Sequence, residues 1–271
     1  MTCPEAGSPP GDGDEARLRE TWRALAGEGG AVLLDGFHAL KHALRFGAAV
    51  HLAVAAPPAS RGPADGPGAA LALARDLAPD LLGPLARLLT PVSAATLREL
   101  VPRPHPTGVA ALAAPAPRAP EPDSPAPVVL LEDPRHLGNL GAVVRVAAGA
   151  GAAGILTTGT TDPWHPAVLR AAAGLHWATP VSRLPGLDAL PPGRPLYALD
   201  PEGTDLRAAS LAPGALLAFG SERSGLSAAL RARADVLLAL PMRPGVSSYN
   251  LATSVAMALY HWLATPQDAR R

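Results

Sequence analysis

Short apolar runs separated by polar loops fill the second half of the chain. "VVLLED", "ALLAFG" and "VLLAL" have the length of strands, and their unbroken apolar character is typical of strands buried on both faces of a sheet. Longer apolar segments, such as residues 139–151 and 250–264, have the length of helices. Strands and helices that take turns in this way predict a parallel α/β sheet with helices on both faces.

Shorter segments complete this pattern. We expect further strands at 154–159, near 180–184 and at 195–200. We expect further helices at 166–176 and 226–234, and a loop over residues 201–211. The second half therefore has enough elements for one sizeable α/β domain.

The first half has a smaller pattern of the same kind. The expected elements are a helix near 16–26, a strand at 32–34, a helix over 37–46, a strand at 50–55 and a last strand after Thr107. Between them, the helical stretch over 69–89 is expected to be interrupted at Pro79 and Pro84. A further helix is expected to begin after a cap at Ser93.

Proline and glycine divide the chain. Residues 114–127, "APAPRAPEPDSPAP", cannot continue a helix or an interior strand and predict a semi-rigid linker. The acidic, Pro/Gly-rich residues 1–15 predict a disordered tail. We therefore expect a smaller α/β domain over 16–113 and a larger one over 128–271.

The composition sets limits on partners and location. The formal net charge is zero, so no global field indicates a nucleic-acid partner, although a local basic patch remains open. Cys3 is the only cysteine, which excludes an intrachain disulfide and favours a cytoplasmic protein. The first residues are unlike a signal peptide, and no apolar run has the length needed to span a bilayer. We expect a soluble, cytoplasmic protein with no membrane partner.

Three short motifs have ordinary structural explanations. "GAGAAG", residues 149–154, has the letters G-x-G-x-x-G, but its glycines close a predicted helix, the reverse of the dinucleotide-binding context. His38 and His42 share a helix face, yet no third ligand is apparent, and we expect no metal. "GSERSG" lacks the spacing of a serine nucleophile elbow. A nucleotide-dependent enzyme that uses "GAGAAG" remains an alternative.

Three polar loops follow predicted strands of the second half. "EDPRHLGNLGAVVRVA" contains Asn139 and Arg145, "AFGSERSGLS" contains Glu222, and "PMRPGVSSYN" precedes the last helix. The carboxyl ends of parallel strands meet at one edge of a sheet, so we expect these loops to form one pocket. Helix capping could explain Asn139, Ser247 or Ser248, and an acidic first turn could explain Glu222. Capping does not explain Arg145 among valines and alanines.

In combination, the three loops resemble the three motifs of the SpoU/TrmH branch of the SPOUT superfamily of RNA methyltransferases. Their order and spacing fit across roughly 128–265. The matching positions are Asn139 and Arg145 in the first motif, Gly220, Glu222 and Gly225 in the second, and Pro241, Met242, Ser248 and Asn250 in the third. Residues 31–112 look like the substrate-binding domain that often precedes this catalytic domain, with a fold similar to ribosomal protein L30e.

The resemblance implies transfer of a methyl group from S-adenosylmethionine to a ribose 2′-hydroxyl of RNA. It implies a SPOUT domain with a parallel sheet and a deep trefoil knot, an L30e-like RNA-binding domain before it, and a homodimer formed through the knotted domain. Ribosomal RNA is favoured over tRNA because the first domain resembles a ribosomal protein, which is an argument by analogy. Housekeeping modification and antibiotic resistance both remain open as roles.

The resemblance also implies residue roles. The expected catalytic residues are Asn139, Arg145, Glu222, Ser248 and Asn250. The expected cofactor-binding residues are Phe219, Gly220, Leu240, Met242, Ser248, Tyr249 and Leu251, and the expected RNA contacts are Lys41, Arg45 and Arg170. Because an arginine keeps its proton at neutral pH, we expect Arg145 to hold a substrate phosphate and polarise the hydroxyl rather than to act as a general base.

The chain departs from the family pattern at several positions. Tyr249 replaces the usual Leu, and Ala252 stands where a second Ser is frequent. Ala167 and Ala172 occupy positions that are commonly Lys and Ser. A non-catalytic RNA-binding protein that keeps the fold is therefore one alternative, and a tRNA 2′-O-methyltransferase is another. The retained catalytic set favours an active enzyme.

Overall fold

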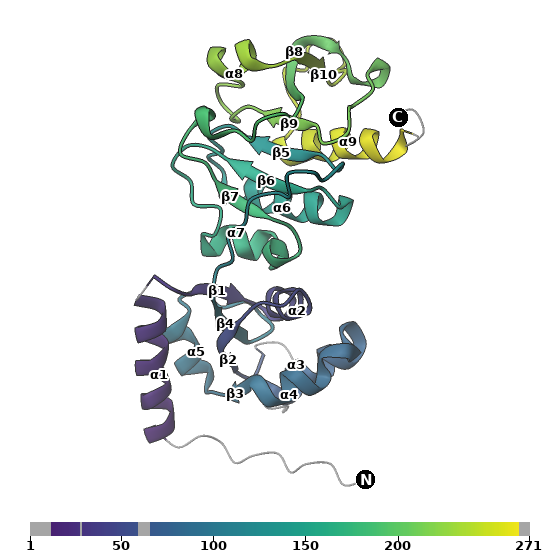
Figure 1. Ribbon diagram of the computed structural model, residues 1–271. Coiled ribbons are helices and arrows are strands. Elements are labelled where there is room, and N and C mark those ends of the chain that lie inside the picture. The colour runs from purple at the N-terminus through teal and green to yellow at the C-terminus, as the bar shows by residue number, and fades with distance from the viewer. Residues whose placement is uncertain (1–11, 28, 59–65, 266–271) are drawn as a thin grey trace. The chain divides into compact units, whose positions relative to one another are not determined.

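The computed structural model describes residues 12–27, 29–58 and 66–265 (Figure 1). The chain divides into two compact units between Pro115 and Ala116, inside the proline-rich segment. Each unit has its own β-sheet and is described separately. Residues 1–11 of the predicted tail lie outside the described residues.

The first unit contains a four-stranded mixed sheet with the order β1-β4-β2-β3. Its strands are β1 (Val32–Asp35), β2 (Val50–Ala55), β3 (Leu89–Pro91) and β4 (Val109–Ala113). β4 runs antiparallel to β1 and β2, and β2 runs parallel to β3. β4 is buried along its whole length, which suits its run of small apolar residues. The three predicted strands are confirmed, whereas β3 was not expected.

Helices α1 to α5 belong to this unit. They are α1 (Asp12–Gly27), α2 (Phe37–Arg45), α3 (Gly66–Leu77), α4 (Leu82–Leu88) and α5 (Ala94–Leu100), with a 3-10 turn at Pro79–Leu81 between α3 and α4. The break expected at Pro79 is confirmed. Pro84 instead lies in the first turn of α4, where a residue without an N–H costs no intrahelical hydrogen bond. Residues 12–15, expected in the tail, are helical.

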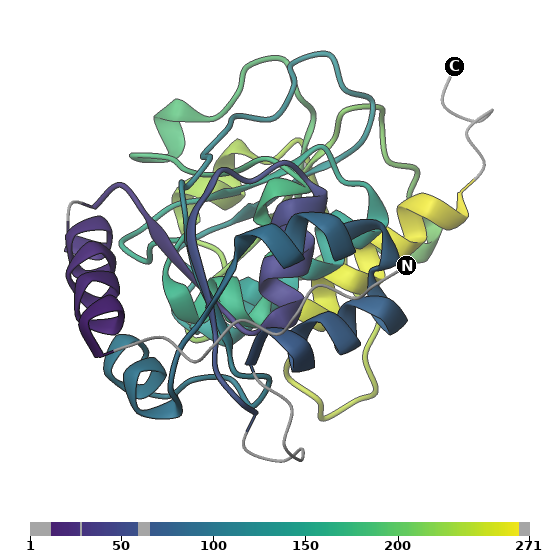
Figure 2. The same ribbon diagram turned by 90° about the horizontal axis from the view of Figure 1, so that it is seen from below.

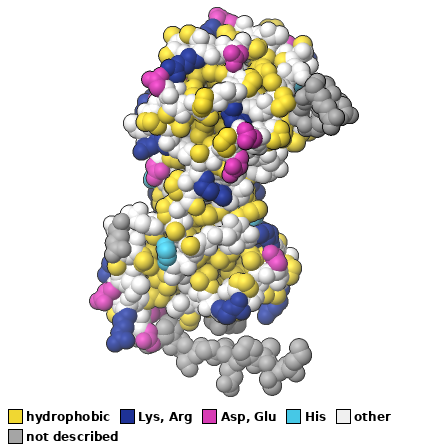
Figure 3. All heavy atoms as spheres, in the orientation of Figure 1, with side chains coloured by type: hydrophobic (Ala, Val, Ile, Leu, Met, Phe, Trp, Pro, Cys, Tyr) yellow, Lys and Arg dark blue, Asp and Glu magenta, His cyan; other side chains and the backbone are white. Residues whose placement is uncertain are grey.

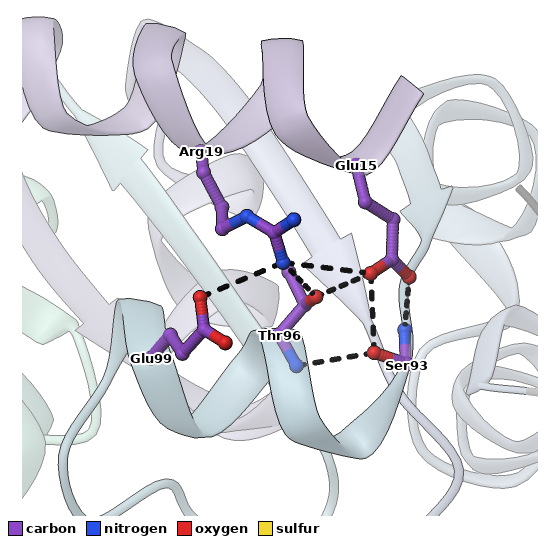
Figure 4. A network of polar contacts seen from close by, with 5 residues as sticks. All are labelled: Glu15, Arg19, Ser93, Thr96 and Glu99. Atoms are coloured by element: carbon purple, nitrogen blue, oxygen red, sulfur yellow. Dashed lines mark hydrogen bonds and ion pairs between the residues drawn. The ribbon is translucent and has the colours of Figure 1, made fainter. Parts of the chain in front are cut away.

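A polar network holds α1 beside the start of α5 (Figure 4), and Figures 1 and 2 show the two helices side by side. Ser93 caps α5 as expected, because its hydroxyl accepts a hydrogen bond from Thr96 N at 3.1 Å. Glu15 accepts a hydrogen bond from Ser93 N at 2.7 Å and another from the Thr96 hydroxyl. Arg19 donates to the same hydroxyl at 2.8 Å. The hydrogen bond from Thr96 is the main reason why the pKa of Glu15 lies below its ordinary value.

The second unit contains a six-stranded sheet with the order β10-β8-β9-β5-β6-β7, and all of its pairings are parallel. Its strands are β5 (Val128–Leu131), β6 (Gly154–Thr157), β7 (Val181–Arg183), β8 (Leu196–Asp205), β9 (Leu216–Phe219) and β10 (Val236–Ala239). Its helices are α6 (Leu137–Ala150), α7 (Pro166–Ala171), α8 (Ala228–Arg233) and α9 (Leu251–Ala264), with 3-10 turns at Leu175–Trp177, Leu187–Ala189 and Leu206–Ala208.

Both faces of this sheet are covered. Val129 and Leu131 of β5 pack in the apolar cluster that contains residues of α6 and α9. The alternate residues Val128 and Leu130 pack in a second cluster, with Leu230 of α8. Successive side chains of a strand point to opposite faces, so the two clusters lie on opposite sides of the sheet. The predicted parallel sheet with helices on both faces is therefore confirmed.

Strand β8 continues beyond the point where the sequence predicted a loop. Its pairing with β10 passes from Ala198 to Thr204 while β10 advances by one residue, so residues 199–203 bulge out of the ladder. A Cβ atom on Gly203 would lie 2.5 Å from the backbone of Leu237, which makes glycine necessary at this position. The prediction was wrong here because pairing resumes after the "PEG" turn, and turn-forming residues conceal a bulged strand.

Residues 116–127 pack against the second unit. Arg118 donates a hydrogen bond to the carbonyl oxygen of Trp177 at 2.9 Å, and Arg194 donates to the carbonyl oxygen of Glu121 at 2.6 Å. A proline-rich segment cannot satisfy its own carbonyl groups through regular structure, and arginine donors do so here. Most of the predicted linker is thus fixed to the second unit and is not a free spacer.

Candidate functional site

An open cavity of about 760 Å³ lies beside the carboxyl ends of β9 and β10 and the bulge of β8. Parallel sheets bind ligands at this edge, and the volume falls within the range of about 300–1,000 Å³ that small-molecule sites have. The lining residues are Asn139, residues 199–201, residues 219–225, Leu240, Met242, residues 247–251 and Ser254. The cavity therefore joins the three loops that the sequence singled out.

The loop after β9 is a tight turn that glycine makes possible. Ser221 and Gly225 exchange two backbone hydrogen bonds, each 3.0 Å long. Gly225 has a φ of +66°, which glycine adopts without strain. A Cβ atom on Gly220 would lie 2.0 Å from the carbonyl carbon of Gly225, so no other residue fits there. This turn directs Glu222 toward the start of α6.

A chain of hydrogen bonds connects the three loops at the cavity wall. Asn139 Nδ2 donates to Glu222 Oε1 at 3.0 Å, and Asn250 Nδ2 donates to Asn139 Oδ1 at 2.9 Å. A carboxylate only accepts hydrogen bonds, so Glu222 fixes the orientation of the Asn139 amide and, through it, that of Asn250. The Oδ1 atom of Asn250 then accepts hydrogen bonds from Ala252 N at 2.9 Å and Thr253 N at 3.4 Å. The first turn of α9 is thereby fixed to the first turn of α6.

Glu222 is held as a carboxylate. Partial burial would raise its pKa, but hydrogen bonds from Asn139 and from the backbone N–H groups of Arg135 and His136 outweigh burial. The pKa of Glu222 therefore lies below its ordinary value. A negative charge before the first turn of α6 is also favoured by the helix dipole.

The structure corrects two expectations about caps. α6 begins at Leu137, and its cap is His136, whose Nδ1 atom accepts a hydrogen bond from Asn139 N at 3.1 Å. Asn139 thus lies inside the helix, where its side chain is available to the cavity. The cap of α9 is Asn250, not Ser247 or Ser248.

An ion-pair cluster supports the cavity wall formed by the bulge of β8. Asp200, which lines the cavity, is only 6% exposed. Arg231 of α8 contacts Asp200 Oδ2 at 2.9 Å and Glu202 Oε2 at 2.5 Å. Asp200 Oδ1 accepts a hydrogen bond from Glu202 N at 3.0 Å. One arginine therefore fixes both carboxylates of the bulge.

Most of the predicted site residues lie together. All of the expected cofactor-binding residues line the cavity, as do Asn139, Glu222, Ser248 and Asn250 from the expected catalytic set. The Tyr249 hydroxyl donates to the carbonyl oxygen of Pro241 at 3.0 Å and closes the loop after β10.

The remaining predicted residues lie elsewhere. Arg145 is exposed on α6 and does not line the cavity. Lys41 is buried in α2 of the first unit, and Arg45 donates two hydrogen bonds to Asp80, at 3.0 and 2.6 Å. Arg170 is exposed on α7 of the second unit. Their contacts with RNA stay predictions.

Sequence reasoning missed the wall formed by residues 199–201 and the side chain of Arg223. The wall at 199–201 could have been predicted, because Asp200 ends the run "PLYALD" at the carboxyl end of a predicted strand. Arg223 could also have been predicted, because it follows Glu222 in a loop that was already expected to form the pocket.

The motif "GAGAAG" keeps its structural explanation. α6 ends at Ala150, and Gly151 follows in the left-handed conformation with a φ of 72°, so "GAGAAG" closes a helix as predicted. Across residues 12–27, 29–58 and 66–265, no three His, Cys, Asp or Glu side chains form a group that could hold a metal ion. Within the same ranges, no helix combines the length and the apolar character needed to cross a membrane.

Comparisons with known proteins agree with the motif pattern. Residues 126–260 match the SpoU rRNA Methylase family. An uncharacterized tRNA/rRNA methyltransferase of Synechocystis sp. is 37% identical over 155 residues, which cover 53% of this chain and 54% of that protein. The 23S rRNA (guanosine(2553)-2′-O)-methyltransferase RlmP of Bacillus subtilis is 32% identical over 148 residues, 49% of this chain and 56% of that protein. The chain spans about half the length of these curated relatives.

A solved structure shares the fold. The SpoU methyltransferase AviRb from Streptomyces viridochromogenes, in complex with AdoMet, matches with a TM-score of 0.71 and 23% identity, over 94% of this chain and 99% of that chain. The expected SPOUT fold is confirmed, while the knot and the L30e-like fold of the first unit stay predictions. Through residues 126–260, the chain belongs to the SpoU rRNA Methylase family.

Proposed function

We propose that this protein transfers a methyl group from S-adenosylmethionine to a ribose 2′-hydroxyl of RNA, with ribosomal RNA as the favoured substrate. The observation that carries the proposal is the hydrogen-bonded chain from Glu222 through Asn139 to Asn250 along one cavity. Helix capping alone would not require the loops after β5, β9 and β10 to meet. A site that must place two reactants together would require it.

The names of the relatives support the reaction and the substrate. RlmP of Bacillus subtilis is named as a 2′-O-methyltransferase of 23S rRNA, and the matched family is described as rRNA methylases. Because the chain spans about half of its curated relatives, the RNA molecule and the nucleotide belong to the proposal. A tRNA substrate is the alternative within the same reaction.

The cavity fits the proposed cofactor. Leu240 and Leu251 offer apolar surface to an adenine ring, and Phe219 and Gly220 line the same cavity. The solved structure of AviRb, which shares the fold, contains AdoMet and supports the same choice of ligand. When bound, S-adenosylmethionine supplies an activated methyl group together with its leaving group. The protein then has to hold and orient the ribose hydroxyl.

Glu222, Asn139 and Asn250 act in this proposal as orienting groups. The lowered pKa of Glu222 makes its carboxylate a weaker base than that of an ordinary glutamate, and its oxygens already accept hydrogen bonds from Asn139 and two backbone N–H groups. Both facts disfavour a general base. Ser248 adds a hydroxyl to the same wall.

A homodimer is part of the proposal. Met257, Tyr260 and Leu263 of α9 are exposed by 38%, 73% and 51%, and their spacing of three residues places them along one helix face. α9 packs against α6, which carries the exposed Arg145. We propose that a second copy binds to this face and brings Arg145 of one copy toward the cavity of the other. There Arg145 would hold a substrate phosphate and polarise the hydroxyl.

A methylation assay tests the proposal. The protein is incubated with labelled S-adenosylmethionine and separate ribosomal RNA and tRNA pools, and the methylated ribose is mapped by its resistance to alkaline hydrolysis. We expect label in ribosomal RNA, whereas label in tRNA alone would favour the alternative substrate. Calorimetric titration with S-adenosylmethionine is the companion measurement. If neither binding nor transfer is measured, a non-catalytic RNA-binding protein becomes the better conclusion.

A further inference from the structure

We propose that Arg223 and Arg243 contact the RNA phosphates on either side of the cavity opening, an inference that rests on the proposed function. Arg223 lies in the loop after β9 and lines the cavity. Arg243 lies in the loop after β10, directly after Met242, which also lines it. Both arginines are exposed. The two loops that form the cavity walls therefore each carry one cation.

Most arginines of the second unit are already engaged. Arg135, Arg207, Arg231 and Arg233 form ion pairs with neighbouring carboxylates. Arg118, Arg183 and Arg194 donate hydrogen bonds to backbone carbonyl oxygens.

Arg223 and Arg243 differ from these residues. Within the described ranges, neither side chain makes a hydrogen bond or an ion pair. A guanidinium has five N–H donors in a planar fork that matches the oxygens of a phosphate. An exposed guanidinium beside a ligand cavity, with its donors unused, is suited to an anionic partner.

Among the described residues, the carboxylates that line the cavity form no ion pair with these arginines. Glu222 is the sequence neighbour of Arg223, but its carboxylate faces Asn139 and the backbone before α6. Asp200, the other acidic residue that lines the cavity, is bound by Arg231. The carboxylates at the cavity are thus committed to other partners, and the two arginines remain for an incoming anion.

The chemistry of the substrate offers anionic partners for both arginines. A ribose inside an RNA strand has one phosphate on its 5′ side and another on its 3′ side. A strand that presents its 2′-hydroxyl to the cavity therefore brings two phosphates to the opening. Figure 3 shows basic and acidic side chains interspersed on the face drawn, and the formal net charge is zero. On such a surface, individually placed cations supply the attraction for an anionic strand.

Salt-dependent RNA binding tests the inference. The affinity for a short fluorescein-labelled single-stranded RNA is measured by anisotropy at several KCl concentrations. Each lost phosphate contact lowers the slope of log affinity against log salt by about 0.7 for single strands, so the double variant Arg223→Gln/Arg243→Gln should lose about 1.4. The matched control is Arg207→Gln/Arg233→Gln, which removes two exposed arginines that do not line the cavity and should leave the slope unchanged. Replacement of Arg223 and Arg243 by Lys should retain most of the slope.

The outcomes separate this inference from the proposed function. If the control variant loses as much slope as the test variant, the inference is overturned, because any two arginines would then contribute equally to RNA binding. Reduced affinity for S-adenosylmethionine in calorimetry, with the RNA slope unchanged, would assign the arginines to the cofactor carboxylate instead. A wild-type protein that methylates RNA while the double variant keeps the wild-type slope contradicts only this inference. A wild-type protein that neither methylates nor binds RNA contradicts both.

Discussion

Two polar networks, one in each unit, are built from the same parts. In the first unit, the carboxylate of Glu15 on α1 accepts hydrogen bonds at the start of α5. In the second unit, the carboxylate of Glu222 accepts hydrogen bonds at the start of α6. Each network contains a helix-capping residue, Ser93 or Asn250. The local chemistry does not separate a structural network from a functional one.

The surroundings of the two networks differ. The Glu15 side chain is 12% exposed, and its partners join two helices into a closed contact. Glu222 is exposed and lines a cavity with Asn139 and Asn250. In the first network, the hydrogen bonds of Glu15 and Arg19 hold α1 to the start of α5. In the second, the same kind of bond holds three loops around a space large enough for a ligand. The comparison teaches that hydrogen bonds of this kind mark a functional site only where they line a cavity.

Breaking the second network should have the largest effect. Asn139→Ala removes the donor to Glu222 and the acceptor for Asn250, which releases the loops after β9 and β10 from α6. Misplacement of reacting groups by about 1 Å can cost about a hundredfold, so we expect kcat/KM for ribosomal RNA to fall at least about a hundredfold. Ser93→Ala, which breaks the cap in the first network, is the control and should keep wild-type activity. If kcat/KM of Asn139→Ala stays within threefold of wild type, the activation free energy has changed by no more than roughly 0.7 kcal/mol. The second network would then be structural like the first.

Acid should sharpen the comparison of the two units. His176 of the second unit is fully buried, its Nε2 atom lies 2.9 Å from the Pro163 carbonyl oxygen, and its Nδ1 atom has no hydrogen-bond partner among the described residues. Burial lowers the pKa of His176 from 6.5 to about 4. The fold holds the neutral ring, so this contribution to stability is complete above pH 6.5 and is lost as the pH falls toward 4.

The expected loss is roughly 3 kcal/mol over that range, from about 1.4 kcal/mol for each pKa unit. Urea unfolding of a Trp22→Phe variant, followed by tryptophan fluorescence, reports on the second unit because Trp164, Trp177 and Trp262 all lie there. His176→Phe in the same background should show a weaker dependence on pH. Equal dependence in both proteins would mean that other groups cause the acid sensitivity.

Breaking the first network should have the smallest effect. Glu15→Ala removes the acceptor for Ser93 N and the Thr96 hydroxyl, and loss of such cap hydrogen bonds costs about 1 kcal/mol. We expect the first unit to be destabilised by this amount in urea unfolding, with the affinity for S-adenosylmethionine unchanged. Glu20→Ala, an exposed position on the same helix, is the control. Reduced cofactor affinity in Glu15→Ala would show that the first network also supports the site.

The elements that could be predicted from the sequence are those with an unambiguous local pattern. Buried strands such as β5 and β9 appear as continuous apolar runs, and the cap at Ser93 follows from its place before a helical pattern. β3 could not be found because it has three residues, ends in proline and owes its pairing to β2. The second half of β8 was missed because proline and glycine in its bulge conceal resumed pairing.

The site was predictable where loops follow strands of one parallel sheet. That rule brought Asn139, Glu222 and Asn250 together before their distances were known. The same rule did not predict where the Arg145 side chain points. Arg145 lies six residues after Asn139 on α6, so the two side chains point in different directions from the helix. Nor could the rule show that Arg45 is paired with Asp80, because the two residues lie 35 positions apart in a different unit.

The link between Asn139 and Asn250 also bears on how the pocket is assembled. These side chains are separated by 111 positions, so the contact closes a long stretch of chain and costs conformational entropy. Until α9 docks on α6, the pocket lacks a wall and offers no complete surface to a ligand. Ligand affinity therefore reports that the last helix has reached its place, and a small molecule bound there would stabilise the finished unit by mass action.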